Sequence, residues 1–201
     1  MVGLRSLVYI RDTVKHSLYG IRISDVKTGM MGLVGNKGSV ITSLYMGDSL
    51  INFANTHLPS GGSNSSKRAT CVADLYKQKI EVEKSDFFFL FGDLNLRVQL
   101  KLEEYKKAML DFQMSNMNID WEMLKSKDEV ALGEQPCLNT YFKEAPLTQN
   151  PTYRLVKGTS KYSDERVASW TDRIFFYYDN EDFKVEIIDF GSLVMSESDH
   201  L

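Results

Sequence analysis

The sequence has few cysteines, no long apolar run and no excess of charge of one sign. Cys71 and Cys137 are its two cysteines and do not form a CxxC pair, which argues against a disulfide framework or a structural zinc site. The longest aromatic and aliphatic run, 87–91, is too short to span a bilayer. Arg5 and Arg11 interrupt the N-terminal segment, unlike the apolar core of a signal peptide. We therefore expect a cytoplasmic protein with reduced thiols that meets lipid only peripherally, from the water side.

The charge balance excludes some classes of partner. The chain has 24 basic and 27 acidic residues, a net charge of -3, so it shows no basic excess of the kind that binds nucleic acid. A glycine-rich Walker loop is also missing from the sequence, which argues against a nucleoside triphosphatase of that type. With 201 residues and 43% hydrophobic content the chain can bury one core. We expect a single domain over residues 1–201, monomeric and part of a larger protein.

The hydrophobic pattern alternates between strands and helices. Strands are expected at 7–10, 19–26, 39–46, 50–55, 86–91, 172–178 and 183–190. Helices are expected at 67–84, 100–112 and 119–127, with a long irregular stretch after them. Strand hairpins next to helical crossovers favour an α/β fold with mixed sheets.

Polar side chains gather just after several apolar strands. They lie in Asn55-Thr56-His57, in Gly92-Asp93-Leu94-Asn95-Leu96-Arg97, in Trp170-Thr171-Asp172-Arg173 and in Ser198-Asp199-His200. Each group also has an ordinary structural explanation, such as a loop histidine, a helix N-cap, a surface ion pair or a solvated tail. Together they supply hard oxygen and nitrogen groups suited to Mg²⁺ and to a phosphate ester.

These segments resemble the inositol polyphosphate 5-phosphatases. The match runs in order through Gly35-Asn36-Lys37-Gly38, Asn55-Thr56-His57-Leu58, the Gly92–Arg97 segment, Pro151-Thr152-Tyr153-Arg154, Trp170-Thr171-Asp172-Arg173-Ile174 and Ser198-Asp199-His200. The Gly92-Asp93-Leu94-Asn95 and Ser198-Asp199-His200 segments also occur in deoxyribonuclease-I-like nucleases. The discriminating motifs are those at 35–38, 151–154 and 170–174. The resemblance implies an α/β, four-layer sandwich of two mixed β-sheets flanked by helices. It also implies hydrolysis of the 5-phosphate of a phosphoinositide headgroup or a soluble inositol polyphosphate.

The resemblance implies a catalytic role for five residues. Asp93 would position or deprotonate the attacking water, and Asn95 would hold this water or a phosphate oxygen. His200, paired with Asp172, would contact the non-bridging phosphate oxygens and stabilise their charge. His57 would stabilise the phosphate or the leaving group.

The resemblance also implies a set of substrate-binding residues. Tyr153 and Arg154 resemble the pair that contacts the ring 4-phosphate, and Arg166 resembles a second basic contact there. Asn36 and Lys37 would face the substrate phosphates. Arg97 and Arg173 are interpreted as structural residues that brace the loops, and Asp164 stands where many members of the family have a basic residue.

The cofactor implied by the resemblance is Mg²⁺, with Asp199 as a supporting ligand. The main glutamate ligand of the family is not found in this sequence, and we expect the domain to be incomplete at both ends. Three hypotheses therefore stay open: a Mg²⁺-dependent phosphatase, a catalytically inactive headgroup-binding fragment, and a nuclease of the wider superfamily. The charge balance and the Pro151–Arg154 motif argue against the nuclease.

Overall fold

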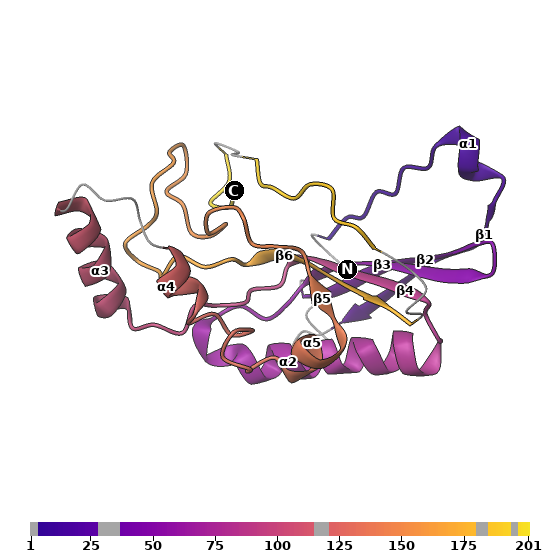
Figure 1. Ribbon diagram of the computed structural model, residues 1–201, viewed down its shortest axis with the longest axis horizontal. Helices are drawn as coiled ribbons and strands as arrows, with labels where there is room; N and C mark the ends of the chain where they lie inside the picture. The colour runs from indigo at the N-terminus through magenta and orange to yellow at the C-terminus, as the bar shows by residue number, and fades with distance from the viewer. Residues whose placement is uncertain (1–3, 28–36, 115–120, 180–184, 194–196) are drawn as a thin grey trace.

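The computed structural model describes residues 4–27, 37–114, 121–179, 185–193 and 197–201, with the side chains of all of these except 111–114. Its centre is a six-stranded sheet in the order β1-β2-β3-β4-β6-β5 (Figure 1). The strands are β1 (Leu18–Lys27), β2 (Gly38–Met46), β3 (Ser49–His57), β4 (Phe87–Asp93), β5 (Lys143–Glu144) and β6 (Asp172–Tyr178). Five of these strands confirm the predicted ones; β5 was not predicted.

The sheet is mixed. β3 and β4 are parallel, and every other neighbouring pair is antiparallel. The turn at Gly47 and Asp48 joins β2 to β3 as a hairpin, as the sequence predicts. A parallel pair requires a crossover, and here it runs through η2 (Gly62–Asn64), α2 (Ser65–Tyr76) and η3 (Lys77–Val82). The predicted helix at 67–84 is therefore confirmed, with its last part π-helical.

One face of the sheet is covered by α2 and α5 (Pro136–Tyr141), which lie along the same side of it (Figure 1). Val72 and Leu75 of α2 are buried in one apolar cluster with Phe88 and Leu90 of β4. Burial of each such side chain contributes roughly 1.5–3 kcal/mol. The sequence did not predict α5, because Pro136 suggested an irregular segment; proline is well tolerated at the first turn of a helix, where it stands here.

A second apolar cluster supports the loop that leads into β6. It joins Trp170 and Ala168 of that loop to Tyr105 of α3 (Leu102–Met114) and Leu124 of α4 (Trp121–Lys125). Trp170 is fully buried, and its indole N–H donates to the carbonyl of Gln149 at 3.0 Å. Both helices confirm predicted ones, and their packing fixes the backbone next to Asp172.

Two predicted strands are wrong where the structure describes them. Residues 7–10 form no strand; Leu7 and Tyr9 are 77% and 89% exposed, and the next element is the short helix α1 (Asp12–Lys15). Residues 185–190 are likewise without strand structure, and Ile188 is 94% exposed. An apolar run becomes a strand only when a neighbouring strand accepts its hydrogen bonds, and neither segment has one among the described residues.

The predicted α/β fold class, a mixed sheet with flanking helices, is confirmed. Within the described ranges the second sheet of the expected sandwich is limited to isolated bridges, from Tyr153 to Ser169 and to His200 and from Leu155 to Tyr162. These bridges bring the chain end back to the start of β6. Of the helices in the described ranges, none combines the length and apolar character needed to cross a bilayer.

Candidate active site

Three inner strands place polar side chains along one edge of the sheet, the one formed by the C-terminal ends of β3 and β4 and the start of β6. β3 and β4 are parallel and end at His57 and Asp93, so these residues leave the sheet on the same side. β6 runs the other way and begins at Asp172, which is the register partner of Asp93. The order of the strands therefore gathers residues that are far apart in the sequence.

Asp93 is held by two neighbours. Its Oδ2 lies 3.1 Å from Nε2 of His57, and the backbone N–H and side-chain Nδ2 of Asn95 each donate to its carboxylate at 3.1 Å. Burial alone would raise the pKa of Asp93, but the hydrogen bond and charge of His57, the charge of His200 and the Asn95 N–H together lower it below its usual 3.8. Asp93 is therefore a carboxylate at neutral pH.

The turn after β4 has a special backbone. Asn95 has a φ of 52°, in the left-handed region that asparagine tolerates better than most residues. Its Nδ2 donates to the carbonyl of Leu58 at 3.1 Å, which ties the ends of β3 and β4 together. The next helix begins only at Leu102, so neither Asp93 nor Asn95 serves as the helix N-cap that the sequence left open.

Asp172 and His200 form a second pair. Nδ1 of His200 lies 2.7 Å from Oδ2 of Asp172, and the hydroxyls of Thr152 and Thr171 donate to the same oxygen at 2.7 and 2.9 Å. Burial works against the charged imidazole, but the hydrogen bond and charge of Asp172, with weaker help from Asp93 and Asp199, raise the pKa of His200 above its usual 6.5. Neither threonine was predicted as a site residue, although both stand within motifs that carry the family resemblance.

Lys37 joins the first pair. β2 pairs Gly38 with His57, which brings the Lys37 ammonium into contact with the His57 ring. Burial lowers the pKa of Lys37; the charge of Asp93 opposes this and that of Arg97 adds to it. Asn36 lies outside the described residues.

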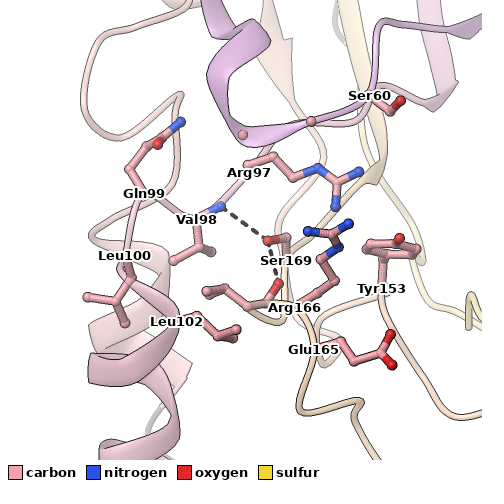
Figure 2. Close-up of a pocket in the computed structure, with 13 residues that line it drawn as sticks. Ser60, Arg97, Val98, Gln99, Leu100, Leu102, Tyr153, Glu165, Arg166 and Ser169 are labelled. Atoms are coloured by element: carbon pink, nitrogen blue, oxygen red, sulfur yellow. Dashed lines mark hydrogen bonds between the residues drawn. The ribbon is translucent and has the colours of Figure 1, made fainter.

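A cavity of about 410 Å³ lies beside these residues. Figure 2 shows the guanidinium groups of Arg97 and Arg166 pointing toward one another, next to Tyr153. Arg97 lies over the Tyr153 ring at 4.6 Å and donates to the carbonyl of Asn95 at 3.1 Å. Tyr153 in turn contacts the His200 ring, with centroids 4.8 Å apart, so the cavity adjoins the Asp172–His200 pair. Leu100 contributes to an apolar wall.

The two arginines interpreted as structural, Arg97 and Arg173, have different surroundings. Arg173 is buried and donates to Asp128 and Glu144 at 2.7 Å, in keeping with a structural role. Arg97 braces the Asn95 turn but also lines the cavity, so its guanidinium is within reach of a ligand there.

Arg154 and Asp199 contact one another at the margin of the site. Nε of Arg154 lies 3.4 Å from Asp199, and its Nη1 donates to Glu165 at 2.7 Å. In the part of the chain that the structure describes, no group of three or more His, Cys, Asp or Glu side chains is placed to hold a metal ion. The described residues therefore do not complete a Mg²⁺ site by themselves. Asp199 pairs with Arg154 here, and its role as a supporting Mg²⁺ ligand stays a prediction.

A comparison with protein families decides the classification. The family model described as endonuclease/exonuclease/phosphatase family 2 matches residues 1–201. The chain belongs to this family. It is 29% identical over 212 residues to synaptojanin of Caenorhabditis elegans, covering 100% of this chain and 18% of the relative. It is 28% identical over 189 residues to polyphosphatidylinositol phosphatase INP53 of Saccharomyces cerevisiae, covering 90% and 17%. The chain thus spans less than a fifth of the length of these two relatives.

Solved structures agree with this family membership. The inositol polyphosphate 5-phosphatase domain of SPSynaptojanin, solved with inositol (1,4)-bisphosphate and calcium, matches with a TM-score of 0.71 and 26% identity, covering 94% of this chain and 54% of that one. A Cimex nitrophorin matches with a TM-score of 0.57 and 21% identity, covering 82% and 55%, which shows the shared fold alone. The resemblance to inositol polyphosphate 5-phosphatases is confirmed, and the enzyme class expected from the motifs is that of the named relatives.

Proposed function

We propose that this chain is the catalytic part of a phosphatase that removes the 5-phosphate from a phosphoinositide or a soluble inositol polyphosphate. One observation carries the proposal: the Asp93–His57 and Asp172–His200 pairs meet at one sheet edge in a member of this phosphatase family. The names of the relatives support the inositol phosphate substrate.

Asp93 is the proposed group that acts on the attacking water. Its lowered pKa makes it a weak base near neutral pH, so its stronger contribution is to orient the water as a charged acceptor. Asn95 already donates to this carboxylate and to Leu58. Its proposed role is therefore to hold Asp93, and through it the water, in place.

His200 is the proposed cation for the non-bridging phosphate oxygens. Because Asp172 accepts from Nδ1, the imidazole is oriented with its other nitrogen available, and its raised pKa favours the charged form. His57, which contacts both Asp93 and Lys37, is the proposed group that stabilises the phosphate or the leaving group.

The ring of the substrate is proposed to lie toward the cavity beside this edge. Tyr153 and Arg166 line that cavity, and Arg154 stands at its margin. Asn36, Lys37, Tyr153, Arg154 and Arg166 are the proposed substrate-binding residues. A headgroup substrate would be met at a membrane surface from the cytoplasm.

Mg²⁺ is the proposed cofactor. The related 5-phosphatase domain was solved with a calcium ion, and Asp93 and Asp199 are hard oxygen donors of the kind that such ions prefer. The metal would supply charge stabilisation at the phosphate. Because the described residues do not complete a metal site, the roles proposed here rest on the protein side chains alone.

The test is a phosphate-release panel on the 201-residue chain, with soluble and lipid substrates that carry or lack a 5-phosphate. Release from 5-phosphorylated substrates only, dependent on Mg²⁺ and abolished by a chelator, is the expected result. Asp93→Asn should lose it, whereas Asp25→Asn, an exposed position on β1, should not. Absence of release from every inositol substrate would contradict the proposal.

A second candidate is a headgroup-binding domain without catalysis. The observation that favours it is the incomplete metal site among the described residues. It predicts binding of inositol phosphates to the chain without phosphate release, at any Mg²⁺ concentration. The same panel, read alongside calorimetric binding, separates the two candidates.

A further inference from the structure

The three arginines near the cavity are not equivalent. Arg97 and Arg166 line it, with their guanidinium groups facing one another in Figure 2, whereas Arg154 is not among the lining residues. Across the described ranges, no carboxylate lies within ion-pair distance of Arg97 or Arg166. Neither cation is therefore paired with a carboxylate in these ranges, although Arg97 also donates to the carbonyl and side-chain oxygens of Asn95.

Arg154, by contrast, already has two carboxylate neighbours. Glu165 accepts from its Nη1 at 2.7 Å, and Asp199 lies 3.4 Å from its Nε. Glu165 is itself a lining residue of the cavity and precedes Arg166 in the chain. One negative charge thus stands among the basic groups, bound to the arginine that a ring phosphate would otherwise contact.

We propose that Glu165 is a specificity-determining residue, which competes with the substrate for Arg154. The inference rests on the proposed function and concerns a second phosphomonoester on the inositol ring, beside the one that is hydrolysed. That phosphate is received by Arg97 and Arg166, and it reaches Arg154 only when it displaces Glu165.

The ion pair is weak enough to be displaced. The side chains of Arg154 and Glu165 are 35% and 69% exposed, and exposed pairs contribute little because water and salt screen them. A phosphate dianion carries more negative charge than a carboxylate, so it attracts a guanidinium more strongly. Glu165 therefore lowers the affinity for the second phosphate without closing the cavity. As a result, the chain binds ring bisphosphates and monophosphates with more similar affinities than it would without Glu165.

The decisive experiment is calorimetric binding of inositol 1,4-bisphosphate and inositol 1-phosphate to the chain and to Glu165→Gln. The variant should bind the bisphosphate about tenfold more tightly and the monophosphate within about twofold, with the gain reduced at high salt. Glu81→Gln is the matched control, because it removes the same charge at an exposed position on η3 that does not line the cavity. An equal change for both ligands, or no change for either, would overturn the proposal.

A second variant tests whether Arg166 binds the second phosphate. Arg166→Gln should weaken bisphosphate binding about tenfold and leave monophosphate binding within about twofold. If Arg154→Gln has the larger effect in the chain with Glu165 intact, Arg154 is not masked and the proposal is wrong. Thermal unfolding of each variant confirms that the fold is kept.

Two further binding measurements distinguish a lipid headgroup from a free inositol phosphate as the ligand. They also separate the role of Glu165 from the proposed phosphatase function. Binding to vesicles with phosphatidylinositol 4-phosphate or with phosphatidylinositol alone tests the lipid headgroup, and soluble inositol phosphates test the free form. Glu165→Gln should strengthen binding wherever the second phosphate is present. These measurements need no turnover. A failed phosphate-release assay would therefore contradict the proposed function, whereas the role of Glu165 would still be tested by the binding affinities.

Discussion

Nδ1 of His200 lies 2.7 Å from Oδ2 of Asp172, a contact between the start of β6 and a residue 28 positions further along the chain. Two threonine hydroxyls donate to the same carboxylate oxygen, so this carboxylate is held in its orientation toward the imidazole. The orientation and charge of His200 therefore depend on a residue that need not touch the substrate.

Asp172→Asn should lower the pKa of His200 and reduce kcat by a factor on the order of 10²–10⁴. The amide keeps the shape of the side chain but removes the charge that raises this pKa, while burial continues to oppose the imidazolium. NMR titration of the His200 ring in both proteins measures the shift. An unchanged pKa in the variant would show that Asp172 does not set the charge of His200.

The native pair should also stabilise the fold in a pH-dependent way. Because the pKa of His200 is raised on folding, its contribution is complete below the usual 6.5 and is lost as the pH rises through the folded value. Urea unfolding between pH 5 and 9 should show this loss for the native chain and not for Asp172→Asn.

Asp93 should give the opposite pH dependence. Its pKa is lowered on folding, so its contribution is present above the usual 3.8 and is lost as the pH falls through the folded value. Unfolding curves from pH 7 to pH 2 should lose this component in Asp93→Asn, and the variant should also lose phosphate release. A native-like acid profile in the variant would contradict the role of the His57 contact.

Gly92→Ala should destabilise the chain by roughly 1–3 kcal/mol and reduce activity. Gly92 has a φ of 119°, and a Cβ there would lie 2.5 Å from the Thr56 carbonyl and 2.7 Å from Oδ1 of Asn55. Gly62→Ala is the control, because an added Cβ meets nothing within 4 Å and its φ is not in the left-handed region. Equal unfolding free energies for the two variants, measured in urea, would refute this reasoning.

Glu129→Gln should cost about 3–5 kcal/mol of unfolding free energy, because it leaves a buried arginine charge without its partner. Arg68 and Glu129 are both fully buried and paired, and Arg68 also donates to the carbonyls of Pro59 and Gly61 at 2.8 Å. The double variant Arg68→Met with Glu129→Leu should lose less than the sum of the losses of Arg68→Met and Glu129→Leu made singly. Chemical denaturation of the native chain, these two single variants and the double variant measures the coupling, and purely additive losses would contradict a buried ion pair.

The sequence predicted the parts of the fold that local patterns specify. The run 86–91 was correctly expected as a central strand, and the helix at 67–84 and the hairpin at Gly47 were expected near their observed bounds. The strand predicted at 7–10 was wrong because an apolar run does not indicate which neighbouring strand will accept its hydrogen bonds. Helix α5 was missed because Pro136 was given more weight than its favourable position at the helix start.

The site was predictable in its residue types and only partly in its contacts. Motifs placed Asp93, His57, Asp172 and His200 together, and the strand order explains why they meet. The pairing of Glu165 with Arg154 has no local signal, because it depends on how the chain bends between them. The same is true of Lys37 and His57, which meet only through the β2–β3 register.

The parallel pairing of β3 with β4, and the pairing of β4 with β6, have a kinetic consequence. Asp93 meets Asp172 only after the chain closes a loop of about 80 residues, and such distant closures form slowly. During refolding, the helical signal of α2 should therefore return before the His200 ring reaches its final chemical shift. The reactive edge is then a late-formed part of the molecule, and its own histidine is a reporter of when folding is complete.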